Sequence, residues 1–218
     1  MTKPIKMTAV GDSLTFGTGA PAEKGFVWVL QDLWRSMQPL DVAHRNYGVV
    51  GATTAETLER LLTNGELRRA VASADVVTLT AGGNDLIRAA MRMYIQGETR
   101  SMKPGMRAFA FAYKDLLGEL VAVHRTMERD ARIVVTDCYN PFPQVRDAVL
   151  WINFVNRCIY RNAASYGGKV LVARSYDAFL GREAHLFADD GVHPNERGHR
   201  ILAECVAEAL SPFLEGLR

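Results

Sequence analysis

Short runs of aliphatic and β-branched residues alternate along the chain with longer stretches in which apolar residues recur at helical spacing. Runs of this kind predict five strands. They are Ile5–Val10, Val42–Tyr47, Asp75–Thr80, Arg132–Thr136 and Val170–Ala173. Strands separated by helices pair in parallel through βαβ crossovers. The alternation therefore predicts an α/β fold, a three-layer α/β/α sandwich around a five-stranded parallel sheet.

The stretches between the strands predict helices, and turn residues mark several of their ends. Pro39 closes one helix, and Asn64-Gly65 interrupts another. The glycines, lysine and proline of Gly97–Gly105 predict a loop. The predicted helices are Phe26–Met37, a broken helix from about Thr54 to Ala72, Asp85 to Tyr94, Ala108–Arg129, Asp147–Ser165 and a final helix through Ile201–Leu214.

Composition limits the class of protein and its partners. The chain has 218 residues, 48% apolar and 23% charged, which is ordinary for a globular protein and excludes disordered and fibrous chains. A length about 1.5 times that of a typical domain favours one domain over residues 1–218. Lys and Arg number 26 against 24 Asp and Glu, and this net charge of +2 is too even for a nucleic-acid or anionic membrane surface.

Cysteine usage and apolar runs give expectations about compartment and metal content. Cys138, Cys158 and Cys205 form no CxxC pair, which argues against a disulfide framework and against a zinc cage. The N-terminal segment does not resemble a secretory signal, and no apolar run approaches the ~20 residues of a membrane span. We therefore expect a soluble, cytoplasmic protein with no transmembrane segment.

A serine lies just beyond the first predicted strand. Ser13 is in the segment Gly11-Asp12-Ser13-Leu14-Thr15-Phe16-Gly17, at the edge of the sheet where functional loops gather. Its hydroxyl would be open to a ligand there, but it is a weak nucleophile until a base removes its proton. Gly, Asp and Ser are also common turn residues, so this segment taken alone slightly favours a plain turn.

A carboxylate and a histidine lie three positions apart just before the last predicted helix, in Asp190-Gly191-Val192-His193-Pro194. A tight turn at the glycine would let Asp190 accept a hydrogen bond from Nδ1–H of His193, which leaves Nε2 free as a base. The neighbouring Asp189 competes for this orienting role, although the spacing favours Asp190. The structural alternative is an Asp-Gly turn that leads into a helix.

Two other predicted strands are followed by loops that offer hydrogen-bond donors. In Gly82-Gly83-Asn84-Asp85, the Asn84 amide is a neutral donor able to stabilise an oxyanion. The loop Asn46–Thr54 contains Gly51, whose N–H is another donor of this kind. The structural alternatives are a helix cap at Asn84 and an ordinary glycine turn.

A nucleophile, an oriented base and oxyanion donors are the parts that acyl transfer through serine requires. Their order along the chain resembles that of the SGNH or GDSL family of serine esterases and lipases. Three blocks of that family read here Gly11-Asp12-Ser13-Leu14, Gly82-Gly83-Asn84-Asp85 and Asp190-Gly191-Val192-His193, and the glycine of the remaining block falls on Gly51. The motifs span nearly the whole chain, and no GxSxG elbow of the α/β-hydrolase type is present.

The resemblance implies a flavodoxin-like fold and ester hydrolysis without a metal or organic cofactor. Ser13 would attack the ester carbonyl, His193 would accept its proton, and Asp190 would orient the imidazole. The N–H groups of Ser13 and Gly51 and the Asn84 side chain would bind the oxyanion, before water hydrolyses the acyl-enzyme. The alternatives are an O-deacetylase of carbohydrate or peptidoglycan, an acyltransferase on the same nucleophile and, from another class, a non-catalytic ligand-binding module.

Methionines and aromatic residues between Met91 and Tyr113 suggest where the substrate lies. Packing between two helices accounts for most of these residues. Methionine also suits an adaptable wall for the acyl group of a small or lipid-like ester, and Phe142, after the fourth predicted strand, suits a second wall. The expected substrate-binding residues are Met91, Met93 and Phe142.

Overall fold

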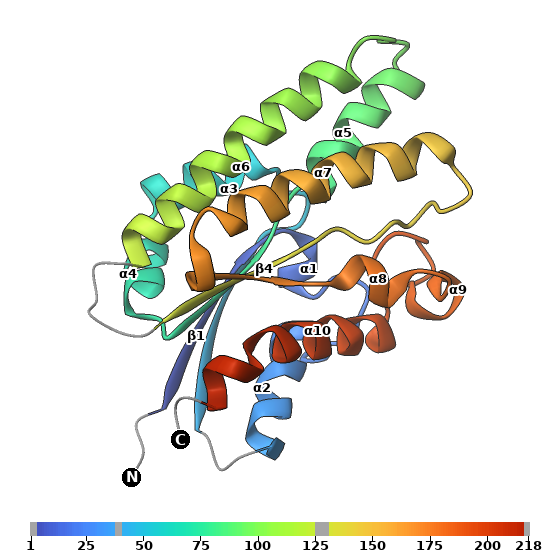
Figure 1. Ribbon diagram of the computed structural model, residues 1–218. Coiled ribbons are helices and arrows are strands. Elements are labelled where there is room, and N and C mark those ends of the chain that lie inside the picture. Colours follow the sequence, from blue (N-terminus) through green and yellow to red (C-terminus); the bar gives the residue numbers. More distant parts are fainter. Residues whose placement is uncertain (1–3, 38–40, 125–130, 216–218) are drawn as a thin grey trace.

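The computed structural model describes residues 4–37, 41–124 and 131–215. Within these residues, one sheet of five strands has the order β2-β1-β3-β4-β5, and every neighbouring pair is parallel (Figure 1). The strands are β1 (Ile5–Gly11), β2 (Val42–Gly48), β3 (Val76–Thr80), β4 (Arg132–Thr136) and β5 (Val170–Ala173). The predicted α/β sandwich is confirmed, and each predicted strand end is correct to within one residue.

Helices cover both faces of the sheet and bury it in two apolar layers. The helices are α1 (Ser13–Phe16), α2 (Phe26–Met37), α3 (Thr54–Thr63), α4 (Gly65–Ser73), α5 (Gly83–Tyr94), α6 (Met102–His124), α7 (Arg146–Ala164), α8 (Ser175–Phe179), α9 (Glu183–Leu186) and α10 (Glu196–Glu215), with a 3₁₀ turn at Gly167–Lys169. α2 and α10 pack on one face, while α3, α4, α6 and α7 pack on the other. The strand β3 is buried along its whole length, as expected for a parallel strand covered on both sides.

The break predicted near Asn64 is present, and its cause is local. Asn64 ends α3, and its side-chain oxygen accepts hydrogen bonds from the N–H groups of Glu66 and Leu67, which starts α4. The short helices α1, α8 and α9 were not predicted, because helical periodicity is read over longer windows. Among the helices of the described residues, none is long and apolar enough to cross a membrane.

α6 differs from its prediction at the N-terminal end. The sequence predicted a loop over Gly97–Gly105 and a helix over Ala108–Arg129, whereas α6 already begins at Met102. The predicted end at Arg129 lies outside the described residues, as does Pro39. The loop prediction was therefore wrong for its last four residues.

The residues that indicated a loop are used to pack α6 against α5. Pro104 lies in the first turn of α6, where a backbone N–H would have no helical partner. Ser101 donates its hydroxyl to the carbonyl of Ala89 on α5 (3.0 Å). A Cβ atom on Gly105 would lie only 2.8 Å from the Cβ atom of Ala89, so the glycine allows the two helices to approach closely.

This close approach predicts that two glycines of α6 respond oppositely to alanine. Gly105→Ala should destabilise the protein by about 1–3 kcal/mol, because its new methyl group overlaps Ala89. Gly118→Ala is the matched control, since a Cβ atom there meets only the Tyr166 hydroxyl at 3.4 Å, and alanine should stabilise the helix by up to about 1 kcal/mol. Urea unfolding of both variants measures the difference, and equal effects would contradict the packing argument.

Candidate active site

The carboxyl ends of the parallel strands all face one edge of the sheet, and the segments singled out in the sequence meet there. Ser13 follows β1, the Gly51 loop follows β2, and Asn84 follows β3. His193 comes from the turn before α10. Ser13, Asn84 and His193 line one cavity, although the first and last of them are 180 positions apart in the sequence.

The turn that carries Ser13 is held by β3 and by its own aspartate. Gly11 has φ +149°, and a side chain there would overlap the backbone and side chain of Thr80. The Asp12 carboxylate caps α1 by accepting hydrogen bonds from Leu14 N–H (3.0 Å) and from the Thr80 hydroxyl (2.7 Å). Ser13 is thereby fixed as the first residue of α1, and its side chain is directed into the cavity.

Ser13, His193 and Asp190 form one chain of hydrogen bonds. His193 Nε2 lies 2.9 Å from Ser13 Oγ, and His193 Nδ1 lies 2.6 Å from Asp190 Oδ2. The second oxygen of Asp190 accepts the backbone N–H groups of Val192 and His193, each at 2.9 Å, so the turn itself positions the carboxylate. Asp189 is exposed, and the carboxylate that contacts the imidazole is that of Asp190.

The Asp190 carboxylate is strongly held in its ionised form. Desolvation acts to raise its pKa, but the hydrogen bonds from the His193 ring and from the two backbone N–H groups outweigh this and lower the pKa to about 2. An ionised carboxylate can only accept at His193 Nδ1, so the ring carries its proton there. Nε2 is then the acceptor for the Ser13 hydroxyl.

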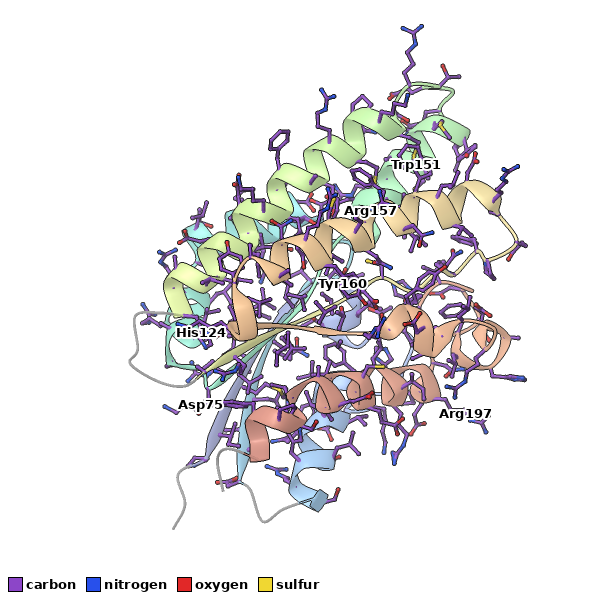
Figure 2. The ribbon with its side chains drawn as sticks, in the orientation of Figure 1. Asp75, His124, Trp151, Arg157, Tyr160 and Arg197 are labelled. Atoms are coloured by element: carbon purple, nitrogen blue, oxygen red, sulfur yellow. The ribbon has the colours of Figure 1, made fainter. Side chains whose placement is uncertain are left out.

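Two other carboxylates near the cavity, those of Asp137 and Asp12, form hydrogen bonds with neighbouring backbone segments instead of with His193. Asp137 accepts hydrogen bonds from the Ser175 hydroxyl (2.8 Å), from Tyr176 N–H (2.8 Å) and from the hydroxyl of Tyr160, which Figure 2 labels on α7. Burial raises the pKa of Asp137, and it also raises that of Asp12. Their hydrogen bonds hold backbone segments together, which leaves Asp190 as the carboxylate that faces the imidazole.

The Gly51 loop carries a free backbone donor and is hydrogen-bonded to Asn84, although Gly51 is not among the residues that line the cavity. Gly51 has φ +78° in a turn closed by the Ala52 N–H to Val49 carbonyl hydrogen bond (3.1 Å). One N–H of the Asn84 side chain donates to the Ala52 carbonyl (3.0 Å), and the amide has a second N–H. In the described part of the chain, the N–H groups of Gly51 and Ser13 have no hydrogen-bond acceptor.

The cavity has a volume of about 540 Å³ and runs from Ser13 between α5 and α7. Trp151, labelled in Figure 2, contributes to its wall from α7. At the far end of these two helices, the Tyr94 hydroxyl donates to Asp147 Oδ2 (2.8 Å), which bridges the space between them. Apart from this pair, the residues that α5 and α7 contribute are mainly apolar: Gly83, Asn84, Leu86, Ile87, Ala90, Ala148, Trp151, Ile152 and Val155.

The structure places the three predicted substrate-binding residues on different surfaces. Phe142 lines the cavity as predicted, but Met91 and Met93 do not. Met91 lies on another face of α5, where it lines a separate cavity with Arg88, and Met93 packs against the core. A methionine-rich stretch does not indicate which helix face meets the substrate, whereas the recurrence of apolar residues at 86, 87 and 90 is the signal that was missed.

Proteins similar to this chain in sequence and in structure identify its family. The GDSL-like lipase/acylhydrolase family matches residues 9–201. The spore germination lipase LipC of Bacillus licheniformis is 31% identical over 216 residues, which are 97% of this chain and 99% of that protein. The crystal structure of the lipase Lip_vut3 from a goat rumen metagenome is 27% identical, with a TM-score of 0.85 over 94% of this chain and 97% of the other.

More distant structures share the fold. A family 3 carbohydrate esterase of Clostridium thermocellum is 21% identical, with a TM-score of 0.72 over 99% of each chain. The family match and the LipC relationship both extend over most of the sequence. The chain therefore belongs to the GDSL-like lipase/acylhydrolase family of carboxylic-ester hydrolases.

Proposed function

We propose that this hydrolase cleaves esters with an extended apolar acyl group, and that Ser13 is its nucleophile. The observation that carries the proposal is the hydrogen-bonded chain Ser13–His193–Asp190 at the mouth of a 540 Å³ cavity with mainly apolar walls. The chain works as one unit over residues 1–218, because the nucleophile and the base come from its opposite ends.

Acylation follows from the protonation states of the three side chains. Ser13 Oγ attacks the ester carbonyl carbon as its proton passes to His193 Nε2, 2.9 Å away. The imidazolium that forms is stabilised by the Asp190 carboxylate. His193 then gives the proton to the leaving alcohol oxygen, the bond from the carbonyl carbon to that oxygen breaks, and the acyl group remains on Ser13.

The negative charge on the carbonyl oxygen needs donors that are already oriented. The free N–H groups of Ser13 and Gly51 and the second N–H of Asn84 are assigned this role. In deacylation, water attacks the acyl carbon while His193 Nε2 takes its proton. The proton returns to Ser13 Oγ, the carboxylic acid leaves, and the same donors bind the second oxyanion.

The cavity supports an extended acyl group rather than acetyl. Its volume lies within the usual range of about 300–1,000 Å³ for small-molecule sites. From Leu86 to Tyr94, eight residue steps along α5, it extends for about 12 Å along the helix axis. An acetyl group would leave most of this apolar space unfilled, so the O-deacetylase alternative is less well supported than a lipid-like ester.

The nucleophile is tested by Ser13→Ala. The variant should remain folded but lose at least about a thousandfold in kcat on p-nitrophenyl butyrate, because no covalent acyl-enzyme can form. A fluorophosphonate should label the wild type once and leave the variant unlabelled. Wild-type turnover by the variant would refute the role of Ser13.

The orienting carboxylate is tested by Asp190→Asn. The amide oxygen can still accept from Val192 and His193 N–H, but its NH₂ group would face His193 Nδ1 and shift the ring proton to Nε2. We expect kcat to fall by about a thousandfold to ten-thousandfold. Because the pKa of Asp190 is about 2, its charge is constant near neutrality, so the loss should be equal between about pH 6 and pH 8.

Asp189→Asn is the matched control for this experiment. It removes the same charge from the adjacent, exposed position and should retain wild-type kcat. If Asp189→Asn is impaired while Asp190→Asn remains active, the assignment of the carboxylate is wrong.

The acyl pocket predicts opposite results for two neighbouring residues of α5. Ala90→Trp places an indole in the cavity, so kcat/KM on p-nitrophenyl octanoate should fall at least about tenfold relative to p-nitrophenyl acetate. Met91→Ala changes another face of the helix and should leave this ratio unchanged. Steady-state kinetics over an acyl-chain series gives the ratio, and a larger change in Met91→Ala would overturn the pocket assignment.

A further inference from the structure

We propose that Arg88 is a positioning residue for the oxyanion hole, acting through the backbone of Gly51. The inference rests on the proposed role of the Gly51 N–H in catalysis. Arg88 is exposed and does not line the cavity that holds Ser13. Its guanidinium binds the Gly51 carbonyl, so any influence on the reaction is exerted through the Gly51 loop.

The Arg88 guanidinium bridges two groups at once. Nη2 donates to the Gly51 carbonyl (2.9 Å) and to Glu56 Oε2 (3.0 Å), and Nη1 donates to Glu56 Oε1 (2.9 Å). Glu56 is itself fixed, because its carboxylate accepts Thr53 N–H (2.8 Å) in a capping box at the start of α3. The hydrogen bond from Thr53 and those from Arg88 lower the pKa of Glu56, so the bridge is ionic at neutral pH.

At Gly51 itself the loop has few packing contacts, although the neighbouring Ala52 and Thr54 are buried. No atom lies within 4 Å of the place where a Cβ atom of Gly51 would be, and Val50 is 54% exposed. Three side chains of α5 form hydrogen bonds with the loop. Arg88 donates to the Gly51 carbonyl, and Asn84 donates to the Ala52 carbonyl. Asp85 accepts hydrogen bonds from the N–H and the hydroxyl of Thr54.

Arg88 restrains the residue with the greatest backbone freedom in this loop. Glycine rotates easily about φ and ψ, and a hydrogen bond to its carbonyl restricts ψ directly. Once that carbonyl is fixed to α5, the Gly51 N–H has a defined direction relative to Asn84, which lies in the first turn of the same helix. An oxyanion hole is effective only when its donors are oriented before the charge develops.

The inference is tested with the variants Arg88→Met and Arg88→Lys and with one control variant, Arg68→Met. Arg88→Met keeps the aliphatic stem and removes all three hydrogen bonds. Arg68→Met is the control, since Arg68 on α4 forms a partly exposed ion pair with Glu119 on α6. Exposed ion pairs contribute little to stability, so both methionine variants should unfold at nearly the same temperature.

Kinetics separates positioning from a purely structural role. Arg88→Met should lower kcat on p-nitrophenyl butyrate by about tenfold, less than complete loss of an oxyanion donor, with KM nearly unchanged. Arg88→Lys, whose ammonium lacks the planar fork, should recover only part of this loss. Arg68→Met should match the wild type in both constants.

A boronic acid provides a second readout. A boronate adduct on Ser13 is tetrahedral and places an oxygen where the oxyanion forms, so Arg88→Met should weaken its inhibition by about the same factor as kcat/KM. A structural defect that merely reduces the fraction of folded enzyme would lower kcat without changing the inhibition constant.

The outcomes also distinguish this inference from the proposed function. If Ser13→Ala is inactive but Arg88→Met has wild-type kcat and boronate affinity, the role of Arg88 is refuted and that of Ser13 stands. If Ser13→Ala remains active, the proposed nucleophile is wrong, and the inference falls with it. A loss in Arg88→Met that Arg68→Met shares equally would also refute positioning by Arg88.

Discussion

The hydrogen bond between Ser13 and His193 depends on a close junction between the two ends of the chain. Gly19, in the segment after α1, packs so tightly against Pro194 and His193 that a side chain would overlap them. His199, fully buried on α10, accepts a hydrogen bond from Phe26 N–H (3.2 Å) and donates one to the Thr18 carbonyl (2.9 Å). The helix that follows the base thus also holds the segment that follows the nucleophile.

The titratable groups near this junction differ in burial: His199 and Asp12 are buried, whereas Asp190 is exposed. Desolvation lowers the pKa of His199, which suits a neutral ring that accepts at one nitrogen and donates at the other. Desolvation also raises the pKa of Asp12, whose hydrogen bonds serve the turn around Ser13. Asp190 is 48% exposed on its side chain and keeps its charge through three hydrogen bonds. One of these comes from the His193 ring, so Asp190 can stabilise a charge that forms there.

Those parts of the fold and site that depend on local residue patterns, or on the order of short motifs along the chain, could be predicted from the sequence. The strands follow from β-branched runs. Ser13 and Asn84 belong to short motifs directly after strands, and Asp190 and His193 belong to a short motif before the last helix. The start of α6 and the pocket-lining face of α5 could not be predicted in this way. Both are set by contacts between elements, such as the approach of Gly105 to α5, which local turn and helix preferences do not encode.

The geometry of α5 explains why Met91 and Met93 do not line the cavity that holds Ser13, and α5 links two parts of the site. With about 100° of rotation per residue, positions 84, 88 and 91 share one side of a helix, whereas 86, 87 and 90 lie on others. The first set begins with Asn84, continues with Arg88 at the Gly51 loop and ends at Met91 beside the second cavity. The second set faces the acyl pocket. One helix therefore carries, on different sides, the side chains that hydrogen-bond to the Gly51 loop and the side chains that line the acyl pocket. Substitutions that change the shape of the pocket can thus leave the hydrogen bonds to the Gly51 loop intact.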